Sequence, residues 1–510
     1  MRTASRPLGA VLLAGFALIA ALLLVSGEEQ TDPRTPPALP GMPAPFLGVA
    51  VLGDGGLTAA VDAYGNVVDL RAPGPAGPAL IENPAERQAA GTVPAETGIQ
   101  VWVRIGGSAR PIWQADSIRQ GYLPGMSVLR TVAQFGEGRV ELLQAARGQV
   151  LAVAAEGIGA SVEMRVNADL GCKQQRQGRV VTLLCSADRR DDGSPLDEVA
   201  AADRRWLQRS RPLGPTAPRW AEQMYERSLL VLRALTDRRN GAVAAGARDG
   251  WAYVWPRDAG AVAIAFAAAG YQSEAKRITR FLLGLDLEGT ARFNGDGSPV
   301  PGRDAQGDEI GWVAAAAQAA GTIGSARHAA EILSQTYPVP WRERPDYWEG
   351  EPGDFLANAI ASGESAERIR GEFGTLDGLA REAGGNGGLE SAAAWAVRPF
   401  PRPALVEPAR RTLLRLAGDA GRYGLLPGEG WSGGEDPWSA PTAWTAWSLA
   451  ALGERSQALR LLGALRRSAT PAGDLPERVD ADTGIPRSTT PLAWSHAFAA
   501  LALRELWPSR

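Results

Sequence analysis

The sequence contains little cysteine and little histidine, and this limits the chemistry that it can carry. Two of its 510 residues are Cys and two are His. A disulfide-rich scaffold is therefore excluded, and a Cys/His metal site is disfavoured because His328 and His496 lie far apart. We expect no metal and no cofactor. Cys172 and Cys185 flank a polar turn between β-prone runs, which predicts a disulfide across a hairpin, with two unpaired thiols as the alternative.

Net charge is also small, at −3, and no array of basic and aromatic residues is present. Nucleic acid is therefore not expected as a partner. Charged residues make up 21% and apolar residues 45%, as in an ordinary globular protein. A chain of this length exceeds one core, which predicts two domains and a targeting segment.

The amino terminus carries an apolar run, Leu8–Val25, after Arg2 and Arg6. Eighteen residues are close to the shortest membrane span, and the basic flank keeps the N-terminus inside. The run ends in LLLVSGEE, a poor cleavage site. Residues 1–27 are therefore predicted to be a signal anchor of a single-pass membrane protein with an extracytoplasmic main part. A cleaved signal peptide and secretion are the alternative. Residues 28–45 form a Pro-rich linker.

Two architectures follow the linker. Residues 46–205 hold short, partly alternating runs such as IQVWVRI and SVLRTVAQF between turn residues, which predicts an antiparallel β-sandwich. Residues 215–508 have helical periodicity, with buried Ala-rich helices alternating with half-exposed ones. This alternation predicts an all-α (α/α)6 barrel. Its twelve helical stretches are predicted to start near Ala217, Asp258, Ser273, Asp308, Ala326, Asp354, Ser365, Gly388, Pro403, Trp438, Arg455 and Thr490.

Tryptophan is abundant, and thirteen of the sixteen Trp lie at or after Trp220. Flat apolar faces with one N–H donor suit sugar rings, although helical cores use Trp as well. Trp444 and Trp447, spaced i, i+3, are assigned to core packing. Other Trp fall in loops rich in Gly, Pro and acids, which should converge at one end of the barrel.

Four of these loops, in chain order, resemble motifs of glycoside hydrolase family 15, the glucoamylase, glucodextranase and bacterial trehalase group. The resemblance covers residues 45–508, since bacterial members also carry an N-terminal β-sandwich. One departure is PER in the last loop, where many members have PEQ, and it leaves substrate choice open. The four segments are YVWPRD (Tyr253–Asp258), DYWE (Asp346–Glu349), GRY followed by GGEDPW (Gly421–Trp438), and LPE followed by TPLAWSHA (Leu475–Ala497).

The resemblance implies that Glu349 is the general acid and Glu477 the general base of an inverting hydrolase. Aromatic neighbours of Glu349 should desolvate it and raise its pKa, and a polar loop should keep Glu477 ionised. Without the motifs, Glu349 and Glu477 would be interpreted as acidic residues on the surface. Glu429 and Glu435 are the reserve candidates.

The resemblance also implies a set of substrate-binding residues. Asp308 has the alternative role of a helix N-cap, and Arg257 with Asp258 that of a buried ion pair. His496 is interpreted as a supporting hydrogen-bond donor rather than a catalyst. The predicted substrate-binding residues are Tyr253, Trp255, Arg257, Asp258, Asp308, Trp348, Arg422 and Trp438.

The function predicted is exo-acting, inverting release of glucose from α-linked glucans or glucosides, with an oligosaccharide or polysaccharide as partner. A trehalase or glucodextranase of the same fold is the alternative among enzymes. A non-catalytic glycan-binding protein at the cell surface is the alternative from another class.

Overall fold

The computed structural model describes residues 50–82, 98–187, 195–322 and 341–509. The predicted signal anchor, the Pro-rich linker and the helix expected near Ala326 lie outside these ranges. Among the described residues, no helix combines the length and the apolar character that crossing a membrane requires.

The first part of the chain is built from strands, and every pairing between the described strands is antiparallel. One sheet has the order β1-β2-β3-β5-β11, with β4 beside β3 and β6 beside β5. The other has the order β12-β13-β10-β9-β8-β7. The strands are β1 Ala50–Gly53, β2 Thr58–Val61, β3 Val67–Arg71, β4 Ala79–Glu82, β5 Gly98–Ile105, β6 Ser108–Pro111, β7 Ser117–Tyr122, β8 Leu129–Phe135, β9 Gly138–Arg147, β10 Val150–Ile158, β11 Ser161–Asn167, β12 Gly171–Gln177 and β13 Val180–Ser186, with a short 3-10 helix at Ile112–Gln114.

One apolar core contains residues of both sheets, because successive side chains of a strand point to opposite faces. In β9, Leu142 belongs to this core, whereas Leu143 points to the other face of its sheet. Helix α3 (Pro195–Leu207) packs on that face through Leu196 and Val199. The predicted β range therefore ends in a helix that covers the six-stranded sheet.

The predicted disulfide is confirmed. Cys172 and Cys185 are direct partners on β12 and β13, and they form the bond with a Cα–Cα distance of 4.1 Å. Strand β12 is largely exposed at the edge of its sheet. The bond therefore ties an edge strand to its buried neighbour.

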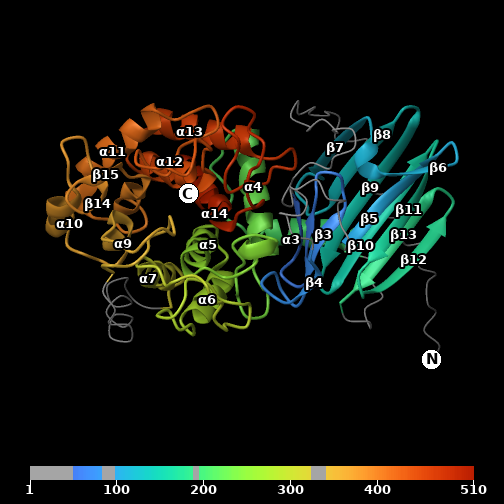
Figure 1. Ribbon diagram of the computed structural model, residues 1–510, viewed down its shortest axis with the longest axis horizontal. Coiled ribbons are helices and arrows are strands. Elements are labelled where there is room, and N and C mark those ends of the chain that lie inside the picture. The colour runs from blue at the N-terminus through green and yellow to red at the C-terminus, as the bar shows by residue number, and fades with distance from the viewer. Residues whose placement is uncertain (1–49, 83–97, 188–194, 323–340, 510) are drawn as a thin grey trace.

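Helices dominate the rest of the chain and lie together on the opposite side of the molecule from the sheets (Figure 1). Most of the predicted helix starts agree with the structure to within a few residues. The helices are α4 Arg219–Ala234, α5 Pro256–Ala268, α6 Gln272–Leu282, α7 Glu309–Ala319, α9 Leu356–Ala361, α10 Ala366–Phe373, α11 Val406–Gly418, α12 Ser439–Ala451, α13 Arg455–Ser468 and α14 Ala493–Leu506, with 3-10 helices η2 Asp249–Trp251, η3 Ser391–Ala396 and η4 Pro403–Leu405.

The helix predicted to start near Gly388 begins at Ser391 as the short 3-10 helix η3, and a hairpin that was not predicted precedes it. Strands β14 (Ala380–Glu382) and β15 (Asn386–Leu389) form a small hairpin there, and η3 follows it. Gly387 and Gly388 have φ values of 75° and 72°, in the left-handed region that a right-handed helix does not use.

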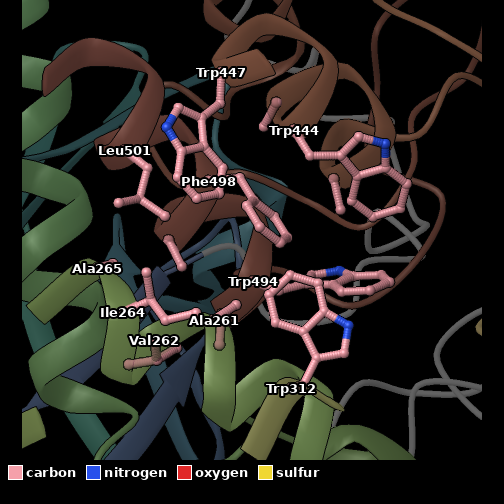
Figure 2. Close-up of a cluster of buried hydrophobic side chains, with 14 of the residues drawn as sticks. Ala261, Val262, Ile264, Ala265, Trp312, Trp444, Trp447, Trp494, Phe498 and Leu501 are labelled. Atoms are coloured by element: carbon pink, nitrogen blue, oxygen red, sulfur yellow. The ribbon is translucent and has the colours of Figure 1, made fainter. Parts of the chain in front are cut away.

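The helical core is aromatic as well as Ala-rich. Trp312, Trp444 and Trp494 come from α7, α12 and α14 and meet with Phe498 in one buried cluster (Figure 2). Trp444 and Trp447 are 0% and 5% exposed, as predicted for core residues. The order of a β part followed by a helical part is confirmed, and closure of the helices into an (α/α)6 barrel stays a prediction.

Candidate active site

A cavity of about 410 Å³ lies in the helical part, where loops enter helices α5, α12 and α14. Its size falls in the range of roughly 300–1,000 Å³ that small-molecule sites occupy. Its walls combine acids, arginines and tryptophans. The lining residues are Ala245, Gly250, Trp251, Trp255, Arg257, Asp258, Arg303, Tyr347, Trp348, Glu349, Trp431, Gly433, Trp438, Glu477, Arg478, Ser488, Leu492 and Trp494.

Glu349 lies on the wall of this cavity with both carboxylate oxygens engaged. Trp255 donates its indole N–H to Oε1 over 3.1 Å, and the Gln306 amide donates to the same oxygen over 3.2 Å. Oε2 forms an ion pair with the guanidinium of Arg303. The Glu349 side chain keeps 25% of its surface exposed.

A tight turn aims the Glu349 side chain. The backbone N–H of Glu349 donates to the carbonyl of Asp346 over 2.9 Å, and that of Trp348 donates to the Asp346 carboxylate over 3.0 Å. Arg381 holds the same carboxylate over 3.0 Å. Glu349 has a φ of 58°, an uncommon conformation for a non-glycine residue that persists where the surroundings fix it. Asp346 therefore sets the direction of Glu349.

Glu477 lies on the same cavity, in the loop that precedes α14. The indole N–H of Trp251 donates to its Oε1 over 3.2 Å, and the Ser488 hydroxyl donates to its Oε2. Its backbone N–H donates to Thr489 over 2.9 Å, and its carbonyl accepts from Ser439 over 2.9 Å. Both ends of the residue are thus fixed before any ligand binds.

The surroundings of the two carboxyl groups differ from those expected. Burial raises the pKa of Glu477, and the hydrogen bonds from Ser488 and Trp251 oppose that rise only in part. Glu349 was expected to be desolvated by aromatic rings, but it is contacted by three donors, one of them a cation. Arg303 causes the difference, because it reaches Glu349 from a loop that the motifs do not cover.

Arg257 and Asp258 lie at the start of α5, where the predicted buried ion pair is present at 3.5 Å between Nη2 and Oδ2. Arg257 also bonds Gln306, contacts Asp308 at 3.5 Å, and lies 4.6 Å from the ring of Trp494. Burial raises the pKa of Asp258 to about 7; Arg257 opposes this, and Asp308 and Glu477 add to it. Both residues line the cavity and can also meet a ligand.

Tryptophans form much of the remaining wall. Trp431 lies edge-to-face with Trp348 at 4.9 Å and with Trp438 at 5.2 Å between ring centroids. These contacts fix the rings without a ligand, which lowers the entropic cost of stacking a sugar on them.

Three predicted binding residues are not among the described residues that line the cavity. Arg422 is exposed, and its guanidinium lies over the ring of Tyr423. Tyr253 lies 5.3 Å from the guanidinium of Arg292. Asp308 is fully buried against Arg257; it occupies the N-cap position of α7, as the alternative role predicted, but its side chain makes no cap hydrogen bond.

The reserve acids and His496 also lie away from the lining. Glu429 accepts from the backbone of Leu389 over 3.1 Å, and Glu435 is exposed. His496 is fully buried; its Nε2 accepts from the Leu475 N–H over 2.9 Å. Burial lowers its pKa to about 3, which keeps the ring neutral. His496 therefore supports the loop of Glu477, although by accepting rather than donating there.

Sequence reasoning missed Trp251, Arg303, Trp431 and Ser488 as site residues. Each belongs to a loop rich in Gly, Pro and acids, or adjoins a recognised motif, so composition pointed to the right segments. Nothing in a single sequence distinguishes Arg303 from its neighbour Arg292, because the difference is the direction of the side chain.

The fold and the cavity define a class of two-part protein, in which antiparallel sheets precede helices whose loops hold an acidic, Trp-lined cavity. A bacterial glucoamylase solved in complex with acarbose has this fold, with a TM-score of 0.69. The two chains share 14% identical residues over 92% of this chain and 95% of that one. At this identity the likeness establishes the fold alone.

Two further solved structures align with the chain over a smaller part. A glycosidase in complex with glucose gives a TM-score of 0.46 at 21% identity, over 56% of this chain and 96% of its own. The glucoamylase from Saccharomycopsis fibuligera gives 0.46 at 14% identity, over 56% and 94%. No family model and no curated protein matches the sequence.

Proposed function

We propose that this protein is an inverting, exo-acting glycoside hydrolase that releases glucose from α-linked glucans or glucosides. The observation that carries the proposal is that Glu349 and Glu477, from separate loops, line one cavity walled by tryptophans. The fold shared with bacterial glucoamylase supports the same class of reaction.

In this proposal Glu477 is the general base and Glu349 the general acid. Ser488 and Trp251 hold the Glu477 carboxylate, which takes a proton from water as the water oxygen bonds the anomeric carbon. Glu349 gives its proton to the glycosidic oxygen as the C–O bond breaks. Trp255 and Gln306 fix Oε1, so the proton resides on Oε2, the oxygen that Arg303 contacts in the free protein.

Arg257 and Asp258 are proposed to bind hydroxyls of the terminal sugar. A guanidinium donates in one plane, and a carboxyl group accepts or shares protons with neighbouring hydroxyls. Arg257 is already oriented by Gln306 and Asp308, so it loses little freedom on binding. Trp348, Trp431 and Trp438 supply apolar faces for the ring.

The test is a substrate panel. The protein from about residue 33 onward is incubated with maltooligosaccharides, isomaltooligosaccharides and trehalose, and glucose release is followed. Glu349→Gln and Glu477→Gln should each lower kcat by about 100-fold or more, because each removes one proton transfer. Glu429→Gln is the matched control and should retain wild-type rates, since Glu429 binds backbone away from the cavity.

The panel also separates the alternatives. Turnover of trehalose or isomaltooligosaccharides in place of maltooligosaccharides favours the trehalase or glucodextranase variant. Binding without turnover of any sugar favours a non-catalytic glycan-binding protein. Wild-type rates in both Gln variants would show that the catalytic residues are others.

We further propose that the protein works outside the cytoplasm, held by its N-terminal anchor or secreted. The disulfide between Cys172 and Cys185 supports an oxidising compartment. Cell fractionation should recover the protein in the membrane or outside the cytoplasm, and recovery in the cytoplasm alone would contradict export.

A further inference from the structure

Arg303 occupies a position that conflicts with the acid chemistry proposed for Glu349. Its guanidinium pairs with Oε2 of Glu349 at the cavity wall. A cation on this oxygen stabilises the ionised carboxylate, whereas a general acid must carry a proton there. In the free protein, therefore, the guanidinium occupies Oε2, the oxygen on which the proposed mechanism needs a proton.

The pair is also open to exchange. Side chains of Arg303 and Glu349 are 42% and 25% exposed, and ion pairs in contact with water are weak. An anion of the ligand can therefore replace Glu349 as the partner of Arg303. Once Arg303 has turned to such an anion, Oε2 is free to take up a proton.

A second arginine borders the same cavity. Arg478 follows Glu477 directly, and its Nη1 lies 3.6 Å from Asp436 Oδ2, beyond hydrogen-bonding distance. Both arginines are partly exposed, at 42% and 36%, whereas Arg257 is buried among Asp258, Asp308 and Gln306. The cavity thus presents two exchangeable cations near the two catalytic carboxyl groups.

We propose that the preferred substrates are small α-glucosides whose leaving group bears a carboxylate, and that Arg303 binds this carboxylate and thereby releases Glu349. The inference rests on the proposed function and adds the class of leaving group. Because Glu349 is proposed to protonate the glycosidic oxygen, we place the guanidinium beside it on the leaving-group side of the cleaved bond, from where it also interacts electrostatically with Glu477. The PER sequence at Glu477 places the second cation, Arg478, on the wall of the same cavity.

The step balances without a further reactant. Arg303 exchanges the Glu349 carboxylate for the substrate carboxylate, and Glu349 takes one proton from solvent. That proton passes to the glycosidic oxygen, and the C–O bond breaks. The water oxygen bonds the anomeric carbon, while its proton passes to Glu477. Products are glucose and a hydroxy acid in its anionic form.

The test compares 2-carboxyethyl α-D-glucopyranoside with its carboxamide, which has nearly the same size and no charge. Alkyl leaving groups need protonation, so both report on Glu349. Wild type should hydrolyse the carboxylate with a kcat/KM about tenfold or more above that of the amide, the effect of one charge-assisted hydrogen bond. Arg303→Gln should remove this preference, mainly by lowering kcat/KM for the carboxylate.

Arg487→Gln is the matched control. Arg487 is 55% exposed, pairs with Asp480, and is not among the described residues that line the cavity. This variant should retain the wild-type preference. Calorimetric binding of both glucosides to Glu477→Gln, in which Arg303 is intact, gives a readout that does not depend on turnover.

The outcomes are distinguishable. Equal hydrolysis of both glucosides by wild type, or an equal loss on both in Arg303→Gln, overturns the inference and leaves the proposed function standing. A different result is that the protein hydrolyses neither glucoside and no sugar in the panel, yet binds the carboxylate glucoside more tightly than the amide. This result overturns the proposed function and supports the anion site. Equal binding without hydrolysis overturns both.

Discussion

The single residue Ser488 helps to determine whether the carboxyl group of Glu477, the proposed base, is ionised. Its hydroxyl donates to Glu477, whose pKa burial raises above the ordinary value of 4.5. A base must be ionised, so activity should rise with pH through this raised pKa. The hydrogen bond stabilises the ionised form and therefore lowers the pH at which activity appears.

Ser488→Ala should shift the acid limb of the kcat/KM profile to higher pH by about one to two units, since the lost bond contributes roughly 1.5–3 kcal/mol to a charged acceptor. A pH–rate profile between pH 3 and pH 8 measures the shift. Thr483→Ala is the control, because that hydroxyl donates to Asp480 in the same loop. An acid limb that stays in place would argue against Glu477 as the base.

At the residue scale, the motifs predicted the two glutamates and Trp255, Arg257, Asp258, Trp348 and Trp438 at one cavity. They did not predict the surroundings of the glutamates. Arg303 lies 46 positions along the chain from Glu349, and Ser488 lies 11 positions from Glu477. A sequence identifies which loops converge, but the direction of each side chain within a loop follows from tertiary packing.

Among the secondary-structure elements, strand β12 depends on its neighbour β13 for its stability. It is an exposed edge strand, and its buried apolar contacts are few. The disulfide closes a loop with a sequence separation of 13 residues, for which chain entropy in the unfolded state contributes about 3 kcal/mol.

Replacing both Cys172 and Cys185 with Ser should therefore lower the Tm of the β part by several degrees. Calorimetry with and without reductant provides the measurement. Reductant should lower the Tm of wild type and leave the double Ser variant unchanged. A double variant as stable as oxidised wild type would show that strand pairing alone holds β12.

Helices that are apolar on all sides were the easiest elements to predict, because such a composition indicates a buried helix. Four helices are of this kind: α5, α7, α12 and α14. The hairpin of β14 and β15 was missed, since four glycines at positive φ carry no periodicity. The α3 helix was missed because its flanking residues resemble the turns of the preceding strands.

The β part of the molecule contacts the loop that carries Glu477, the proposed base. The Tyr122 hydroxyl, at the end of β7, lies 2.7 Å from the Val51 carbonyl and 3.1 Å from Asp474 Oδ2. Asp474 is fully buried and precedes Glu477 by three residues. Burial raises the pKa of Asp474 to about 7, and the tyrosine hydroxyl opposes this rise. The sheet thus helps to fix the loop of the proposed base.

Tyr122→Phe should lower the free energy of unfolding by about 1–3 kcal/mol, because it leaves a buried carboxyl without this donor. It should also lower kcat several-fold with little change in KM. Tyr225→Phe is the control: its hydroxyl binds the Arg211 carbonyl, away from this loop. If both variants lose similar stability but only Tyr122→Phe loses kcat, the β part is coupled to the activity of the Glu477 loop. Unchanged kcat in both variants would contradict this coupling.

Glu349 and Glu477 are proposed to act as acid and base on opposite sides of an α-glucosidic bond. Proton NMR of the first product formed, before mutarotation, tests it most directly, because direct attack by water inverts the anomeric carbon. An α-linked substrate should first yield β-glucose. Initial release of α-glucose would contradict it.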